Sequence, residues 1–366
     1  MDELANHLIT CYEKGIFLPY LLELRVSHKC NLKCIYCPGY DNEVNPAKSL
    51  STKKWLLLIQ EAKMLGIQEC AFFSDLEPLM HKDALKIMVE IKRQNLFGQM
   101  TTNGTLLDER MCTKLIENEW DEINVSIEGP DKETNDYIRG NGTFNKVYDN
   151  LLCLQKIKKR LHKENPKIIF NVVLTNKIYS KIDKMIIFAS KLGISFINFQ
   201  ALSLWNNKCK NLQLTRAQDM QLVRHIHLSD KLSKQLKLRT NIHTFVNTSW
   251  TEYSIRGYSN NKKEHEKNKH ELLNIDCYLP WYFISVDEDG RVNPCHTIRE
   301  SKENVNNKTL KEIWSGPYFD YVRKKIQEKD FPKRCYTNCC VVQAAHHLDL
   351  RNEIKDIINK MHKFSE

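Results

Sequence analysis

The sequence predicts an α/β fold, an open (β/α)6 partial TIM barrel followed by a small C-terminal α+β extension. Across residues 21–201, β-rich runs alternate with segments whose apolar residues recur at helical spacing. This alternation is typical of a parallel sheet with right-handed crossovers. Six strand–helix units are visible, whereas a closed barrel needs eight. The 366 residues also suffice for about two domains at ~150 residues each.

Each unit of the expected barrel begins with a short strand. Residues 168–174 form a nearly continuous apolar run, as in a strand buried on both faces. Gly66 and Gly193 follow two of the helical segments and are typical helix stops. The expected strands are 21–27, 69–74, 98–103, 122–128, 167–175 and 195–201, and the expected helices are 51–65, 83–94, 108–120, 144–162 and 179–192.

The pattern changes after residue 204. Residues 287–290 read Asp-Glu-Asp-Gly between two short β-rich runs, which predicts a hairpin. The other expected features are basic helices over 215–238, a polar linker over 260–270, hairpin strands over 281–286 and 291–295, and helices over 310–327 and 344–362. We therefore divide the chain into the barrel (1–205), a helical and basic linker region (206–276) and a cluster-bearing domain (277–366).

Thirteen cysteines are the unusual feature of the composition. They are too sparse for a disulfide scaffold, and the first residues offer neither the basic start nor the apolar run of a signal peptide. No apolar run approaches the length of a membrane span. We therefore expect a cytoplasmic protein, in which clustered cysteines indicate metal or redox chemistry.

Three cysteines lie directly after the first expected strand, with the spacing C-x3-C-x2-C. They are Cys30, Cys34 and Cys37. In barrel-like α/β folds this end of the strands carries the active site. Three thiolates can each ligate one iron of a four-iron cube and leave the fourth iron open, as catalysis requires. A zinc site or chance clustering are the alternatives.

This spacing, with aromatic Tyr36 before the last cysteine, resembles the signature of the radical S-adenosylmethionine (radical SAM) superfamily. The resemblance implies that the open iron of a 4Fe-4S cluster chelates the methionine moiety of SAM. An electron from the cluster then cleaves SAM, and the 5′-deoxyadenosyl radical abstracts a substrate hydrogen. The cofactor supplies this chemistry, and the protein orients it.

Further motifs follow at successive strand ends in the order that the family shows. Glu77-Pro78 matches the end of a Gly-Gly-Glu-Pro type motif that binds the SAM amino group, although Asp75 and Leu76 replace its glycines. The resemblance implies cofactor contacts for Tyr36, Glu77, Asn103 in a Thr-Asn-Gly turn, Ser126 in a Ser-hydrophobic-Asp-Gly type stretch that reads Ser-Ile-Glu-Gly here, and Arg139 at the SAM carboxylate. A catalytic acid or base is not identifiable.

Five further cysteines lie in the C-terminal region, at Cys277, Cys295, Cys335, Cys339 and Cys340. With the expected hairpin between the first two, this segment resembles the SPASM/Twitch extension of radical SAM enzymes. That resemblance implies one auxiliary 4Fe-4S cluster held by four thiolates, and the fourth ligand is either Cys339 or Cys340. A structural zinc site with the same ligands is the alternative.

The other five cysteines stand alone, as small buried hydrophobic residues do. They are Cys11, Cys70, Cys112, Cys153 and Cys209, and we assign them no role.

The substrate is less clear than the cofactors. The net charge of +10 names no partner, and no RNA-binding module is recognisable, so nucleic acid is disfavoured. Only 29 residues precede Cys30, too few for the peptide-recognition domain of many peptide maturases. We therefore expect a small-molecule or carbohydrate substrate, oxidised by a dehydrogenase-type reaction. A ribosomally made peptide or protein is the alternative, and a non-catalytic zinc or iron–sulfur binding module is an alternative of another class. The reductant implied is a flavodoxin or ferredoxin.

Iron content tests the two-cluster interpretation. Anaerobic reconstitution should load about eight irons per chain, because two cubane clusters hold four irons each. Iron and zinc are measured by elemental analysis. About four irons would remove the auxiliary cluster, and zinc without iron would contradict the enzyme interpretation.

Overall fold

The computed structural model describes residues 2–37, 49–204, 207–245, 270–296, 299–331, 335 and 341–363. The chain forms two compact units. Unit 1 consists of Met1–Leu24, Ser49–Cys70 and Ile255–Glu366, and unit 2 consists of Arg25–Lys48 and Ala71–Ser254. Each unit therefore gathers stretches that are far apart in the sequence, and the three-part division of the sequence stays a prediction.

Unit 2 contains the second to the sixth strand of the expected barrel in chain order, whereas most of the first belongs to unit 1. The strands of unit 2 are the last three residues of β2 (Glu69–Phe73), then β3 (Phe97–Thr102), β4 (Glu122–Ser126), β5 (Lys167–Leu174), β6 (Phe196–Ala201) and β7 (Arg239–Thr240). The pairs from β3 to β7 are all parallel. The parallel sheet is confirmed, and β7 is a short strand that we did not expect.

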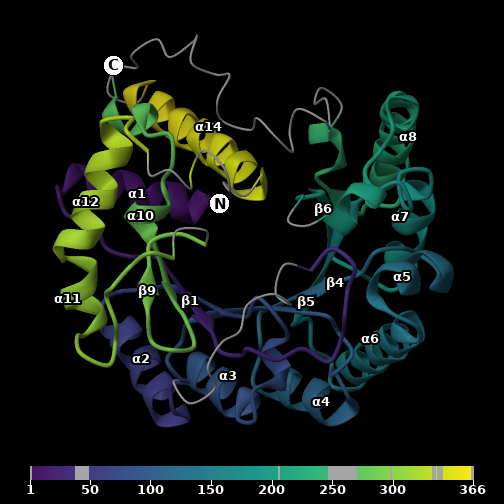
Figure 1. Cartoon of the computed structure of the whole chain (residues 1–366), viewed down its shortest axis with the longest axis horizontal. Coiled ribbons are helices and arrows are strands. Elements are labelled where there is room, and N and C mark those ends of the chain that lie inside the picture. Colours follow the sequence, from purple (N-terminus) through teal and green to yellow (C-terminus); the bar gives the residue numbers. More distant parts are fainter. Residues whose placement is uncertain are drawn as a thin grey trace. The chain divides into compact units, whose positions relative to one another are not determined.

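Helices lie along the outer side of these strands (Figure 1). They are α3 (Ala84–Arg93), α4 (Glu109–Glu117), α5 (Lys132–Arg139), α6 (Thr143–Arg160), α7 (Ile182–Lys191) and α8 (Arg216–Gln235). Side chains fix where several of them begin: Asp108 accepts from the Met111 amide at 2.8 Å, and Asp131 accepts from the Thr134 amide at 2.8 Å. Such N-caps satisfy amides that have no partner inside the helix.

Strand β5 shows how unit 2 separates its two faces. Its buried residues alternate strictly with more exposed ones, so Phe170 and Val172 are buried while Asn171 and Val173 are half-buried. Our expectation of a strand buried on both faces is therefore wrong. Only the helix-covered face is fully buried, and the other face carries the partly exposed side chains, Asn171 among them.

Unit 1 contains three further strands. Strand β8 (Phe283–Val286) pairs in parallel with β1 (Leu21–Arg25) and antiparallel with β9 (Val292–Asn293). The expected hairpin is confirmed, and Gly290 takes the positive φ of +86° that its turn requires. The first residues of β2 also belong to this unit.

Helices complete unit 1, and several of them depart from the expectation. The segment 310–327 is not one helix but two, because Gly316 and Pro317 separate them and a proline at the first turn cannot continue a preceding helix. The helices are α1 (Asp2–Glu13), α2 (Thr52–Met64), α10 (Leu279–Tyr282), α11 (Leu310–Trp314), α12 (Pro317–Gln327) and α14 (Val341–Lys363). The expected linker over 260–270 lies outside the described residues except for His270.

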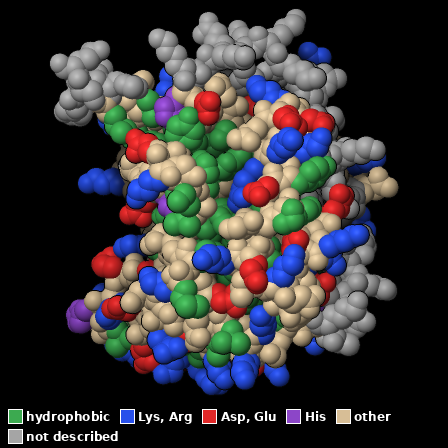
Figure 2. Space-filling model, turned by 90° about the vertical axis from the view of Figure 1, so that its left-hand side faces the viewer, with side chains coloured by type: hydrophobic (Ala, Val, Ile, Leu, Met, Phe, Trp, Pro, Cys, Tyr) green, Lys and Arg blue, Asp and Glu red, His purple; other side chains and the backbone are tan. Residues whose placement is uncertain are grey.

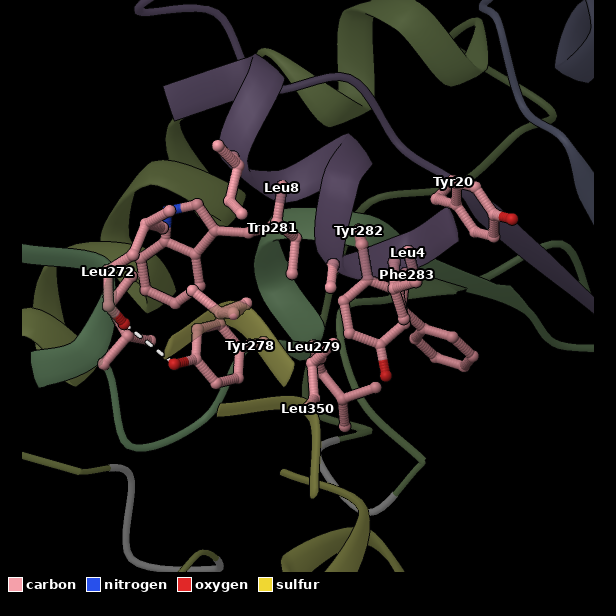
Figure 3. Close-up of a cluster of buried hydrophobic side chains, with 14 of the residues drawn as sticks. Leu4, Leu8, Tyr20, Leu272, Tyr278, Leu279, Trp281, Tyr282, Phe283 and Leu350 are labelled. Atoms are coloured by element: carbon pink, nitrogen blue, oxygen red, sulfur yellow. Dashed lines mark hydrogen bonds between the residues drawn. The ribbon is translucent and has the colours of Figure 1, made fainter. Parts of the chain in front are cut away.

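A single hydrophobic cluster joins both ends of the chain inside unit 1 (Figure 3). Leu4 and Leu8 from α1 and Leu350 from α14 pack with the aromatic residues around α10. Tyr278 is fully buried, and its hydroxyl donates to the Leu272 carbonyl at 2.8 Å, so its polar end is satisfied. The N-terminal helix, which the sequence did not reveal, thereby belongs to the core of this unit.

The surface gives little information about partners. On the face drawn in Figure 2, Lys and Arg side chains are mixed with Asp and Glu over most of the area. Among the described residues, no helix is both long and apolar enough to cross a bilayer.

A close approach in unit 2 provides a test of the packing. A Cβ on Gly98 of β3 would lie 2.7 Å from the buried ring of Trp120. Gly98→Ala should therefore lower the free energy of unfolding by about 1–3 kcal/mol, the usual cost of overpacking. Urea denaturation measures this loss. Combining the substitution with Trp120→Phe should cost less than the sum of the two single losses, and strict additivity would contradict the clash.

Candidate cofactor site

The three cysteines of the motif lie in the loop that follows β1. Cys30, Cys34 and Cys37 are all half-buried and unpaired by disulfides. The Cys37 amide donates to the Cys34 carbonyl at 3.2 Å, so a tight turn joins the last two. The Leu32 amide lies 3.4 Å from the Cys30 sulfur, and this N–H group favours the thiolate form of that ligand.

Glu77 is the central side chain of the neighbouring strand end. It is only 1% exposed and accepts three hydrogen bonds, from the Thr102 hydroxyl (2.7 Å), the Asn103 amide (2.7 Å) and the Leu79 amide (3.1 Å). Burial raises the pKa of Glu77, and these donors act in the opposite direction. The Glu77 amide also donates to the Lys29 carbonyl at 2.9 Å, which ties the cysteine loop to this carboxylate.

Asn103 connects the end of β3 to the same loop. Its side-chain amide lies 3.8 Å from the Cys30 sulfur and donates to the Asn31 side chain at 2.9 Å. Its carbonyl oxygen accepts from the Thr105 amide at 2.9 Å, which fixes the orientation of the amide. Gly104 follows with φ of +76°, as the tight Asn-Gly turn requires. The turn therefore directs a donor at the first cysteine.

Arg139 reaches the second cysteine from the end of α5. One terminal nitrogen, Nη1, lies 4.0 Å from the Cys34 sulfur, and the other, Nη2, donates to Glu128 at 2.8 Å. Tyr36 also donates its hydroxyl to Glu128. The side chains of Arg139 and Glu128 are 9% and 1% exposed, so this ion pair is buried. Burial alone would lower the pKa of Arg139, but the charge of Glu128 and the hydrogen bonds to it raise this pKa.

The electrostatics of the loop oppose free thiolates. Burial raises the pKa of Cys34 to about 11 despite the nearby Arg139 guanidinium, and burial also raises the pKa of Cys30. Cys37 adds to both shifts, which indicates that the three thiols lie near one another. A metal centre would reverse this preference, because a coordinating thiol is deprotonated by the metal.

Ser126 ends β4 on the polar face of the sheet and begins a row of polar side chains. It lies opposite Asn171 of β5, which lies opposite Asn198 of β6. The Asn198 amide donates to the Asn171 carbonyl oxygen at 3.0 Å, and the Asn241 amide donates to Asn198 at 3.1 Å. We call Ser126, Asn171, Asn198, Gln200 and Asn241 the amide row.

Two polar groups of the amide row have no hydrogen-bond partner among the described residues. Gln200 also donates to the side-chain carbonyl oxygen of Asn171, at 3.4 Å, so this oxygen accepts two hydrogen bonds. Asn241 is itself fixed by two bonds to the Phe199 backbone, of 2.8 and 2.9 Å. Among the described residues, the Asn171 NH2 group and the Ser126 hydroxyl then have no protein partner. A ligand on this face would meet an oriented donor beside a hydroxyl.

The structure thus brings most predicted site residues into two contact networks at the cysteine loop. One joins Cys30, Asn103 and Glu77, and the other joins Cys34, Arg139 and Tyr36 through Glu128. Ser126 makes no side-chain hydrogen bond to a described residue. Sequence reasoning missed Thr102, Glu128 and the members of the amide row other than Ser126. Asn198 and Gln200, two positions apart on one expected strand, and Asn171 within an otherwise apolar run are the signal that could have revealed the row.

Two residues that replace the expected glycines are now placed. Asp75 is exposed and pairs with buried Arg25 at 2.7 Å. Leu76 is half-buried, and its amide donates to the Ser74 hydroxyl at 3.1 Å. The turn is therefore held by side-chain bonds where the family motif has glycines.

Comparison with known families decides between the interpretations of this site. Residues 24–189 match the model of the radical SAM superfamily, and residues 277–340 match that of SPASM, an iron–sulfur cluster-binding domain. The chain therefore contains a radical SAM domain followed by a SPASM domain. The radical SAM domain implies a 4Fe-4S cluster and SAM as cofactors, and the SPASM domain implies auxiliary iron–sulfur clusters. The non-catalytic module is thereby disfavoured.

Solved structures of this superfamily share the fold. SuiB from Streptococcus suis, bound to S-adenosylmethionine, is 16% identical with a TM-score of 0.64, and the match covers 87% of this chain and 71% of SuiB. Native anSMEcpe with bound AdoMet is 18% identical with a TM-score of 0.60, and the match covers 94% of this chain and 100% of that one. At these identities the likeness concerns the fold alone.

The cysteine loop and its neighbours offer the donor set that a SAM-binding cluster would need. They offer three thiols, N–H groups aimed at two of the sulfurs, and a buried cation. In the part of the chain that the structure describes, no three Cys, His, Asp or Glu side chains already form a metal-binding group. The fit therefore rests on donor chemistry.

The C-terminal cysteines lie in unit 1. Cys277 and Cys295 both pack against the hydrophobic cluster of Figure 3. Burial raises the pKa of Cys335 to about 12. Cys339 and Cys340 lie outside the described residues. Of the five isolated cysteines, Cys153 is half-buried and the other four are buried.

The buried carboxylate Glu77 provides a test of this site that needs no cofactor. Glu77→Gln places an amide against N–H donors and should lower the free energy of unfolding of the cluster-free chain by about 1–3 kcal/mol. The exposed Glu133→Gln is the control and should change it by only a few tenths, about 0.5 kcal/mol at most. Equal effects of the two substitutions in urea denaturation would contradict the role of Glu77.

Proposed function

We propose that this chain is a radical SAM enzyme that modifies a peptide or protein substrate by hydrogen abstraction. The amide row carries this proposal. It lies on the half-buried face of the barrel strands and begins at Ser126, one of the residues that we expect to contact SAM. Carboxamides both donate and accept hydrogen bonds, and peptide groups offer the same pair of functions.

The partners of similar structures agree with this class of substrate. SuiB has been solved bound to its precursor peptide SuiA, and anSMEcpe with the Cp18Cys peptide. Both cover more than nine-tenths of this chain, at 93% and 92%. These names support a peptide over the carbohydrate-type substrate that we expected from the sequence.

Each site residue has a proposed task. Cys30, Cys34 and Cys37 would hold three irons of a cluster that, with SAM bound, supplies the radical chemistry. Glu77, Asn103, Ser126 and Arg139 would bind and orient SAM, beside Tyr36. Cys277, Cys295 and Cys335, with Cys339 or Cys340, would hold an auxiliary cluster. A flavodoxin or ferredoxin is the proposed electron donor.

Deuterium transfer tests the substrate class even while the substrate itself is unidentified. Cells are grown in deuterated medium, and their extract is separated into peptides, proteins and small molecules. The reconstituted enzyme is incubated with unlabelled SAM, dithionite and each fraction. Hydrogen abstraction from a substrate carbon moves deuterium into 5′-deoxyadenosine, which mass spectrometry detects. We expect this label with the peptide or protein fraction.

The controls separate the outcomes. Cys34→Ala should form no 5′-deoxyadenosine, because the cluster loses a ligand. Label that appears only with the small-molecule fraction would contradict a peptide substrate and favour the dehydrogenase-type reaction. Absence of SAM cleavage by the wild-type enzyme would contradict the proposed function as a whole.

A further inference from the structure

The guanidinium of Arg139 lies between a buried carboxylate and a cluster ligand. Its Nη2 and Nε atoms donate to the same oxygen of Glu128, at 2.8 and 3.2 Å, and its Nη1 lies 4.0 Å from the Cys34 sulfur. The guanidinium therefore donates to Glu128 through Nη2 and Nε, and its Nη1 faces the Cys34 thiol. All of these contacts are made by the chain's own residues.

Glu128 is held as firmly as the arginine. Its first carboxylate oxygen also accepts from the Tyr36 hydroxyl, and its second accepts from the Val173 amide at 3.1 Å. Its own amide donates to the Asn135 side chain at 3.0 Å. Donors from the cysteine loop, from α5 and from β5 thus converge on one carboxylate. Because Glu128 is 1% exposed, water does not screen its charge.

The two buried charges must act on a cluster at Cys34 in opposite directions. Reduction adds a negative charge to the cluster, and a nearby cation with N–H groups at a ligand sulfur stabilises that charge. A carboxylate behind the cation weakens the effect. Removing either charge therefore shifts the reduction potential, with opposite sign.

We propose that the buried Arg139–Glu128 pair, positioned by Tyr36, sets the reduction potential of the SAM-binding cluster through the Cys34 ligand. This inference rests on the proposed function, since it needs the cluster. It assigns Arg139 a task in addition to the SAM contact that the family resemblance implies, and it makes Glu128 a positioning residue. A contact with SAM alone would leave the potential unchanged when SAM is absent.

The test is a redox titration of the reconstituted enzyme without SAM, followed by electron paramagnetic resonance. The SAM-binding cluster is recognised as the signal that changes when SAM is added afterwards, and any auxiliary signal serves as an internal reference. Arg139→Gln should make the potential more negative and Glu128→Gln should make it more positive. We expect each to change the oxidised-to-reduced ratio at a fixed potential about tenfold, ~59 mV for one electron.

If the Arg139→Gln variant fails to load iron, the double variant Arg139→Gln/Glu128→Gln is titrated in its place. Arg139→Gln leaves Glu128 buried without its cation, which is strongly destabilising, whereas the double variant removes both charges. The reduction potential of the double variant should be more negative than that of Glu128→Gln. Lys181→Gln is the matched control. It removes a cation that pairs with Asp131 at 3.1 Å in the same unit, and it should leave the reduction potential of the cluster unchanged.

The outcomes distinguish this inference from the proposed function. Shifts of opposite sign, with an unmoved auxiliary signal, would support the inference. Unchanged potentials, or shifts of the same sign, in variants that still load the cluster would overturn it and leave the proposed function intact. A wild-type enzyme without any SAM-responsive signal would overturn both.

Discussion

Burial of two carboxylates, beyond the ends of β2 and β4, is the constraint on which the cofactor site depends. Glu77 and Glu128 are each 1% exposed, so their oxygens must find donors inside the protein. The donors come from the segments that carry the other site residues: the turn after β3 for Glu77, and the cysteine loop, α5 and β5 for Glu128. Satisfying these charges therefore fixes where the loop can lie, and the thiols are placed as a consequence.

The two faces of the sheet in unit 2 differ in burial, and this difference explains how the unit combines a stable core with a reactive site. Helices seal one face of the sheet, where Phe170 and Val172 are buried. The other face keeps half-buried carboxamides, which hydrogen-bond one another through the Asn171 side-chain oxygen. A radical enzyme needs such a pre-organised polar surface, since the protein's own task is to position reactants and exclude competing reactions.

Unit 1 is organised around a hydrophobic cluster. It joins helix α1, the β8–β9 hairpin and helix α14 through one aromatic cluster, against which Cys277 and Cys295 pack. Cys277 and Cys295 therefore lie beside an apolar core. An apolar surrounding is one of the factors that tune the potential of an iron–sulfur cluster.

The sequence alone determined the parallel α/β fold, the hairpin and the superfamily, because these depend on local periodicity, turn residues and cysteine spacing. It misjudged the burial of β5 and the continuity of residues 310–327, and it did not reveal α1. Only the tertiary structure paired Arg139 with Glu128 and aligned Ser126 with Asn171 and Asn198. Those partners are separated along the chain, and only strand register and the need to pair buried charges bring them together.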